Sequence, residues 1–188
     1  MIIEHPCADR ESISQFILAI TCDWSNSLEQ VGVFEIRCLQ EDRAPESATF
    51  TLDQTNEAAD FAMRMNAKQL NVYMTINPIK VDASIKAGKG AKDKDILRAH
   101  YSFADADNEQ GIKGLNELRD RIEPDLIITT GLIPNERRHN YYRFNEPCTD
   151  LKLWEARQKN IAIQFETDPS VVNPSRIMRV AGTVSYPN

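Results

Sequence analysis

Two aspartates, Asp105 and Asp107, stand two residues apart in the stretch AHYSFADADNEQ. In a β-strand, side chains two residues apart project from the same face, about 6–7 Å from one another along the strand. Two carboxylates on one face repel each other. A divalent cation relieves that repulsion, and Mg²⁺ is commonly held by one or two carboxylates together with substrate phosphates. The alternative is a solvated strand end that leads into a turn, because Asp and Asn favour turns.

A second group of residues that could bind a ligand lies in DLIITTGLIPNERRHNYYRF. Thr130 and Gly131 are expected to end a strand in a turn whose backbone N–H groups can face an anion. Arg137, Arg138 and His139 follow shortly afterwards, and charge-assisted hydrogen bonds from such side chains bind phosphate strongly. A phosphate grip and an ordinary exposed loop explain this stretch equally well.

The third group is FETDPSVVNPSRIMRVAGT. Glu166 and Asp168 are expected at the end of a helix, where a negative charge is unfavourable against the helix dipole and often has another partner. Asp168 is either a third acidic ligand or simply the opener of an Asp-Pro turn. A short helix is expected at 174–179, with Arg176 and Arg179 on one face. Together, the three groups suggest metal-dependent phosphoryl or nucleotidyl transfer.

Hydrophobic periodicity indicates the elements that must position these residues. Helices and strands alternate along the chain, without an internal repeat, which predicts a mixed α/β or α+β class. The Asp105–Asp107 pair falls in an expected strand, and Asp150 is expected to cap the helix that precedes Glu166. The expected helices are 9–20, 54–69, 108–122 and 150–165, and the expected strands are 31–39, 71–78, 97–107, 125–130 and 138–147.

Composition narrows the class of protein. Of the 188 residues, 41% are hydrophobic and 27% are charged, as in an ordinary soluble domain. No stretch approaches eighteen consecutive apolar residues, and the N-terminus lacks the features of a secretory signal. We therefore expect a cytoplasmic protein without a membrane span. The formal net charge of −6 argues against a protein that coats DNA passively. An acidic chain with basic segments near a carboxylate pair suits an enzyme that acts on phosphates better.

A basic segment at 80–98 could contact nucleic acid. Its residues 80–95 are expected to form a mobile loop with some helix at the end. Its lysines either follow the backbone of a template or primer or are merely solvent-exposed. Trp24 and Trp154 could stack on bases, but their place on expected amphipathic helices favours packing in the core. The candidate nucleic-acid-binding lysines are Lys86, Lys89, Lys92 and Lys94.

In this order, NVYMTINP, FADADN, the Thr-Thr-Gly stretch with its later His-Asn-Tyr-Tyr, and DPSVVNPSRIMRVAGT resemble the archaeo-eukaryotic primase superfamily. They are most similar to the primase-polymerase domains at the N-termini of phage and plasmid replication proteins. The resemblance implies one α+β catalytic domain over 1–188, forming the N-terminal part of a longer protein. It also implies an α/β lobe over about 1–98, a lobe like an RNA-recognition motif over about 99–188, and an active site between them.

The resemblance also implies roles for individual residues. Asp105, Asp107 and Asp168 match the acids that hold two Mg²⁺ or Mn²⁺ ions, with Glu166 as the alternative to Asp168. His139 matches the histidine that contacts the phosphates of the incoming nucleotide. The sequence departs from the family pattern at two places. The loop before His139, LIPNERR, is longer, and position 173 is an asparagine where many relatives have an aspartate. The remaining expected nucleotide-binding residues are Thr130, Gly131, Arg137, Arg138, Arg176 and Arg179.

The function expected from this resemblance is template-directed synthesis or extension of primers on single-stranded DNA. Its expected partners are the DNA template, nucleoside triphosphates and a fused or associated replicative helicase. Two other classes stay open: a metal-dependent nuclease, which also uses clustered carboxylates, and a non-catalytic nucleic-acid-binding replication module.

Overall fold

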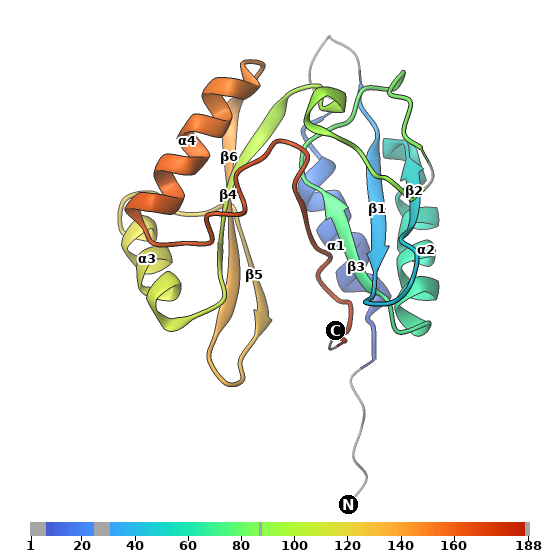
Figure 1. Ribbon diagram of the computed structural model, residues 1–188, viewed down its shortest axis with the longest axis horizontal. Helices are drawn as coiled ribbons and strands as arrows, with labels where there is room; N and C mark the ends of the chain where they lie inside the picture. The colour runs from blue at the N-terminus through green and yellow to red at the C-terminus, as the bar shows by residue number, and fades with distance from the viewer. Residues whose placement is uncertain (1–6, 25–30, 87, 187–188) are drawn as a thin grey trace, which may run out of the picture. The chain divides into compact units, whose positions relative to one another are not determined.

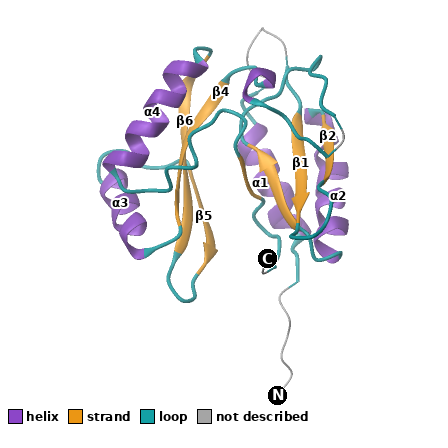
Figure 2. Cartoon of the chain, in the orientation of Figure 1, coloured by secondary structure: helices purple, strands orange, loops and turns teal. Residues whose placement is uncertain are grey.

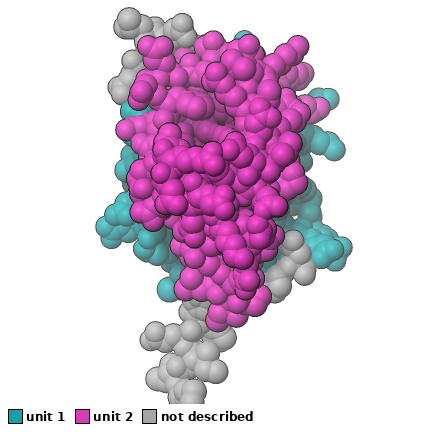
Figure 3. Space-filling model, turned by 90° about the vertical axis from the view of Figure 1, so that its left-hand side faces the viewer, with its two compact units in different colours: residues 1–91, 177–188 teal, residues 92–176 magenta. Residues whose placement is uncertain are grey.

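The computed structural model describes residues 7–24, 31–86 and 88–186, and it divides the chain into two compact units (Figure 3). Unit 1 comprises 1–91 and 177–188, and unit 2 comprises 92–176. The units thus divide after residue 91 rather than near residue 98, and residues 177–188 fall in unit 1 rather than with the preceding segment. The C-terminal segment returns to unit 1 because its strand pairs with a strand of that unit.

Unit 1 is built on an antiparallel four-stranded sheet with strand order β2-β1-β3-β7. Figure 1 labels the strands β1, β2 and β3 of this sheet. Helix α1 begins after Asp9, whose carboxylate accepts hydrogen bonds from two backbone N–H groups of the first turn. The α1 residues Ile13, Phe16, Ile17 and Ile20 are buried, as the helical spacing predicts. The elements of unit 1 are α1 (Arg10–Thr21), β1 (Phe34–Leu39), β2 (Glu46–Phe50), η1 (Leu52–Gln54), α2 (Thr55–Ala67), β3 (Asn71–Thr75) and β7 (Ile177–Arg179).

Two strands of unit 1 depart from the sequence-based expectations. Strand β2 was not expected, because ESATF has too few apolar residues to signal a strand by itself; it forms at the sheet edge against β1. The helix expected at 174–179 is wrong. Residues 177–179 are instead the strand β7, paired with β3, so a non-local partner overrides the local preference.

Unit 2 contains a three-stranded antiparallel sheet with strand order β4-β6-β5 (Figure 2). The order strand, helix, strand, strand, helix matches the first five elements of the βαββαβ motif. The long strand β6 lies in the middle of the sheet. The elements are η2 (Asp93–Asp95), β4 (Ala99–Ala106), α3 (Glu109–Arg119), β5 (Leu126–Gly131), β6 (Arg137–Cys148) and α4 (Leu151–Gln164).

The two helices of unit 2 pack on one face of its sheet. Ala104 and Ala106 of β4 form a buried cluster with Leu115 of α3. The Trp154 indole of α4 donates a 2.9 Å hydrogen bond to the Tyr101 carbonyl oxygen of β4. Trp154 is thus core, as expected. Trp24 is fully buried too, although it lies in the turn after α1 rather than on the helix. Neither ring is available for stacking on bases.

The basic segment ends in a short turn of 3₁₀ helix, η2, where some helix was expected. Lys86, Lys89, Lys92 and Lys94 are all exposed. Their exposure suits both alternatives, so nucleic-acid contact by these lysines stays a prediction. No helix among the described residues is both long and apolar enough to cross a membrane.

Candidate active site

Strand alternation on β4 separates the acidic side chains from the helix-packed face of the unit 2 sheet. Ala104 and Ala106 face the helices, so Asp105 projects from the opposite face. Asp105 lies directly across from His139 of β6, and His139 Nε2 is 3.4 Å from Asp105 Oδ1. The Tyr141 hydroxyl lies 3.3 Å from the other ring nitrogen of His139. The sheet register therefore brings the first expected acid and the expected histidine together.

The third acid is positioned by the way α4 ends. Glu166 adopts a left-handed conformation with φ of 51°, and the Thr167 N–H donates a 3.1 Å hydrogen bond back to the Ala162 carbonyl oxygen. This is the bonding of a Schellman C-cap, which turns the chain away from the helix. The Asp168 N–H then donates a 2.9 Å hydrogen bond to the Asp105 carbonyl oxygen. Asp168 is thereby fixed beside β4.

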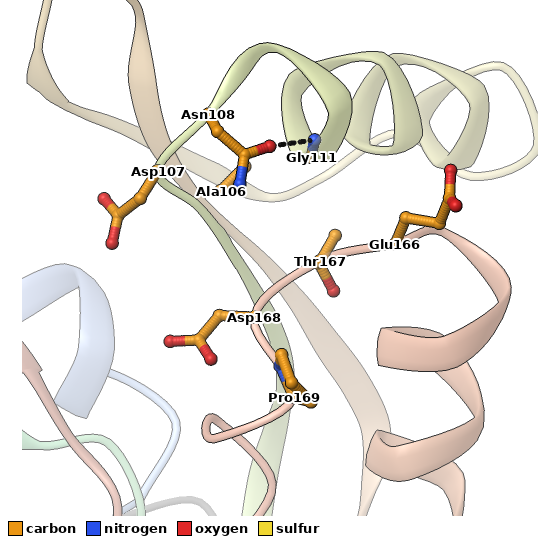
Figure 4. A pocket seen from close by; sticks show the side chains of 8 residues that line it. All are labelled: Ala106, Asp107, Asn108, Gly111, Glu166, Thr167, Asp168 and Pro169. Carbon is orange, nitrogen blue, oxygen red and sulfur yellow. Dashed lines mark hydrogen bonds between the residues drawn. The ribbon is translucent and has the colours of Figure 1, made fainter.

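Figure 4 separates the two alternatives for the third acid. The carboxylates of Asp107 and Asp168 extend to the same side, whereas Glu166 points the other way. The Glu166 carboxylate instead accepts a hydrogen bond from the Gln110 amide of α3. All three of Asp107, Glu166 and Asp168 line a cavity of about 230 Å³, together with residues at the start of α3, so the direction of the side chains is what separates the two alternatives. The geometry favours Asp168 over Glu166 as the companion of Asp105 and Asp107.

Two glycines of α3 allow this close arrangement. A Cβ atom on Gly114 would lie 1.6 Å from the Phe165 carbonyl oxygen, and one on Gly111 would lie 2.9 Å from the Ala106 Cβ. The helix backbone therefore lies directly against both β4 and the end of α4. The Asn108 side chain caps α3 by accepting a 2.9 Å hydrogen bond from the Gly111 N–H.

The environment of Asp105 is unusual for a carboxylate. Burial, followed by the negative charges of Asp107 and Asp168, raises the pKa of Asp105 to about 7, although Arg176 acts in the opposite direction. Asp105 Oδ1 is buried and accepts no hydrogen bond, and its 3.4 Å contact with His139 Nε2 is an ion pair only when the imidazole is protonated. An ionised Asp105 needs a compensating positive charge that these residues only partly supply.

These features bear on whether the site suits a metal ion. No three His, Cys, Asp or Glu side chains converge into a metal cage in the part of the chain that the structure describes. However, the donor set is carboxylate oxygen, which Mg²⁺ and Mn²⁺ prefer. A buried, unbonded Asp105 oxygen beside two further carboxylates fits a hard divalent cation.

The two arginines before His139 lie on opposite faces of β6. Arg138 is paired with Ala106 on the helix-packed face, where its guanidinium donates a 2.6 Å hydrogen bond to the Asn116 side chain of α3. Arg137 is two residues from His139 and shares its face. Because side chains alternate along the strand, Arg138 does not share a face with Arg137 and His139, and phosphate binding by these three residues stays a prediction.

The structure also shifts the turn expected after Thr130. Strand β5 continues through Gly131, which pairs with Arg137, so the hairpin tip lies at 132–136 instead. The Gly131 Cα lies against the Arg137 guanidinium, where a Cβ would come within 2.3 Å. At the tip, the Asn135 amide donates a 3.0 Å hydrogen bond to the Asp107 carbonyl oxygen. Asn135 was not singled out in the sequence, where it is simply one more polar loop residue.

Arg176 and Arg179 are not placed together on one helical face. Arg176 belongs to unit 2, where its charge acts on Asp105. Arg179 belongs to unit 1, where it stacks on the Tyr73 ring at 5.0 Å and donates a 2.9 Å hydrogen bond to the Asn71 side chain. Nucleotide binding by Arg179 stays a prediction.

No family model and no curated protein sequence matches the chain. Three solved structures do. The archaeo-eukaryotic primase domain of the cyanophage S-2L primase-polymerase aligns with a TM-score of 0.65 and 20% identity, over 95% of this chain and 84% of that one. The structure of primase RepB' aligns with a TM-score of 0.62 and 16% identity, over 91% of this chain and 50% of that one. The catalytic domain of primase RepB', in complex with initiator DNA, aligns with a TM-score of 0.60 and 16% identity, over 93% of this chain and 76% of that one. The chain has an archaeo-eukaryotic primase-type fold.

Proposed function

We propose that this chain is a DNA primase-polymerase that makes or extends primers on single-stranded DNA by metal-dependent nucleotidyl transfer. The observation that carries the proposal is the hydrogen bond from the Asp168 N–H to the Asp105 carbonyl oxygen, which supports Asp168 as the third acid of the site. The archaeo-eukaryotic primase-type fold supports the same assignment.

In this proposal the three acids would hold two Mg²⁺ or Mn²⁺ ions. Such ions, when bound, lower the pKa of an attacking hydroxyl and neutralise the triphosphate. The 3′-hydroxyl of the primer end attacks the α-phosphorus of the incoming nucleotide, a phosphodiester bond forms, and pyrophosphate leaves. By holding the metal ions, Asp105, Asp107 and Asp168 would orient the attacking hydroxyl and the triphosphate.

Side chains of the protein are also needed to bind the phosphates of the nucleotide. His139 faces Asp105, and its ring is oriented by the contact with the Tyr141 hydroxyl. Arg137 lies on the same face of β6, and its Nε is buried without a hydrogen-bond partner. His139 and Arg137 are therefore proposed to bind the β- and γ-phosphates. Their contribution to catalysis would be electrostatic stabilisation rather than proton transfer.

The proposed partners are a single-stranded DNA template, nucleoside triphosphates and a fused or associated replicative helicase. One of the similar structures is a primase catalytic domain in complex with initiator DNA. The exposed lysines Lys86, Lys89, Lys92 and Lys94 are proposed to contact the nucleic-acid backbone.

The test is a primer-synthesis and primer-extension assay on single-stranded DNA with Mg²⁺ or Mn²⁺. Wild type is compared with Asp105→Asn, Asp107→Asn and the control Glu117→Gln, which removes an exposed carboxylate of α3. Product from wild type and the control, but not from the two aspartate variants, is the expected result. Full activity in Asp105→Asn would overturn the site. DNA cleavage without nucleotides would favour a nuclease, and DNA binding without either reaction would favour a non-catalytic module.

A further inference from the structure

The side chain of Asp168 is held by one neighbour, Ser170. The Ser170 N–H donates a 2.8 Å hydrogen bond to Asp168 Oδ1, and the Ser170 hydroxyl donates a 2.8 Å hydrogen bond to Asp168 Oδ2. Both carboxylate oxygens are thus bonded from the same residue. Since each carboxylate oxygen has two lone-pair sites, each keeps one for a further partner.

Ser170 also receives hydrogen bonds from Arg176. The Arg176 Nη2 donates a 2.6 Å hydrogen bond to the Ser170 hydroxyl oxygen and another to the Ser170 carbonyl oxygen. The hydroxyl therefore accepts from a guanidinium on one side and donates to a carboxylate on the other. In such a chain, each hydrogen bond polarises the next and strengthens it.

The segment that carries Arg176 is itself anchored. The Asp93 carboxylate accepts hydrogen bonds from the Ser175 N–H at 3.0 Å and from the Ser175 hydroxyl at 2.7 Å. The Asn173 side chain donates a hydrogen bond to the same Asp93 oxygen at 3.3 Å. Arg176 therefore projects from a fixed turn, and its contact with Ser170 is built into the fold of unit 2.

We infer that Ser170 is a positioning residue for the proposed metal site. Its hydroxyl fixes the orientation of the Asp168 carboxylate and links that carboxylate to the charge of Arg176. Without the hydroxyl, the Asp168 carboxylate keeps only the hydrogen bond from the Ser170 backbone N–H, and the Arg176 guanidinium keeps only the Ser170 carbonyl oxygen as an acceptor. The Asp168 carboxylate is then held at one oxygen instead of two, and its link to Arg176 is lost. This inference rests on the proposed function, because it assigns Ser170 a role at the same site.

The experiment measures Mn²⁺ binding to the purified protein by electron paramagnetic resonance, without nucleotide or DNA. Ser170→Ala removes the hydroxyl, Ser170→Thr keeps it, and Ser84→Ala is a matched control at an exposed serine of unit 1. Removing a group that orients a metal ligand commonly weakens metal affinity by about 10–100-fold, and we expect Ser170→Ala to fall in this range. Ser170→Thr and Ser84→Ala should bind Mn²⁺ as wild type does.

Thermal unfolding of each variant separates positioning from folding. If Ser170→Ala does not fold, Ser170→Cys keeps the size of the side chain with a weaker hydrogen-bonding group, and the same loss of affinity is expected. Wild-type affinity in the folded Ala or Cys variant would overturn the inference and leave the proposed function intact. A wild-type protein that neither binds Mn²⁺ nor extends primers would instead overturn the proposed function, and the inference with it.

Discussion

The backbone N–H of Asp168 donates a 2.9 Å hydrogen bond to the carbonyl oxygen of Asp105. This bond joins the segment after α4 to strand β4, and it decides which acid stands beside the Asp105–Asp107 pair. Glu166 is only two residues from Asp168, but its left-handed backbone directs its side chain to Gln110 instead. Backbone conformation, not residue type, distinguishes the two acids.

The first prediction compares Asp168→Asn with Glu166→Gln, two changes that each remove one negative charge. We expect Asp168→Asn to lower the rate of primer extension by about 100-fold or more, because it removes a proposed ligand of the divalent cations that would stabilise the transition state. Glu166→Gln should leave the rate nearly unchanged. Steady-state kinetics with Mg²⁺ and Mn²⁺ provide the measurement, and the reverse order of effects would make Glu166 the third acid.

The second prediction concerns pH and stability. The pKa of Asp105 is raised from 3.8 to about 7, first by burial and then by Asp107 and Asp168. Between these two pKa values the folded protein holds more protons than the unfolded chain. The free energy of unfolding therefore falls as the pH rises through this window, in the absence of divalent cations.

Asp105→Asn should remove this contribution, since an amide does not titrate. The stability of the variant relative to wild type should rise by on the order of 3 kcal/mol between pH 4 and pH 8. Urea unfolding at a series of pH values, with chelator present, measures the effect. Curves for wild type and Asp105→Asn that run parallel across the window would contradict the assignment. His139 and Arg176 also lie near Asp105, so the comparison with the variant is needed to isolate its contribution.

The third prediction tests the close packing of α3. Gly114→Ala introduces a Cβ at 1.6 Å from the Phe165 carbonyl oxygen, a backbone atom that cannot rotate away. We expect a loss of about 1–3 kcal/mol in the free energy of unfolding, as is usual for overpacking. Lys113→Ala, at the exposed preceding position, is the control and should change stability by less than about 0.5 kcal/mol. A neutral Gly114→Ala would show that α3 can move away from α4 at low cost.

The fourth prediction separates the two arginines of β6. Arg137→Ala should raise the KM for nucleotides by about 10-fold, the effect of losing one charge-assisted hydrogen bond to phosphate. Arg138→Ala should act mainly on stability, because Arg138 is 8% exposed and bonded to Asn116. Nucleotide kinetics together with thermal unfolding check both. A normal melting temperature with a raised KM in Arg138→Ala would restore Arg138 to the nucleotide site.

Local sequence determined much of this protein. Apolar spacing places α1, α2, α3 and α4 close to their observed bounds, because burying one helical face requires that spacing. The strand that carries Asp105 was also predictable, and so was the capping of α4 by Asp150. The ordered motifs led to the fold that the solved structures support.

Only the tertiary structure decided the rest, because those features depend on partners distant in sequence. Residues 177–179 form a strand since β3 offers a free edge, whereas their local pattern suggested a helix. The register of β6 against β4 places His139 beside Asp105 and turns Arg138 toward α3. The choice of Asp168 over Glu166 follows from one backbone hydrogen bond to Asp105, and no spacing within the chain encodes that contact.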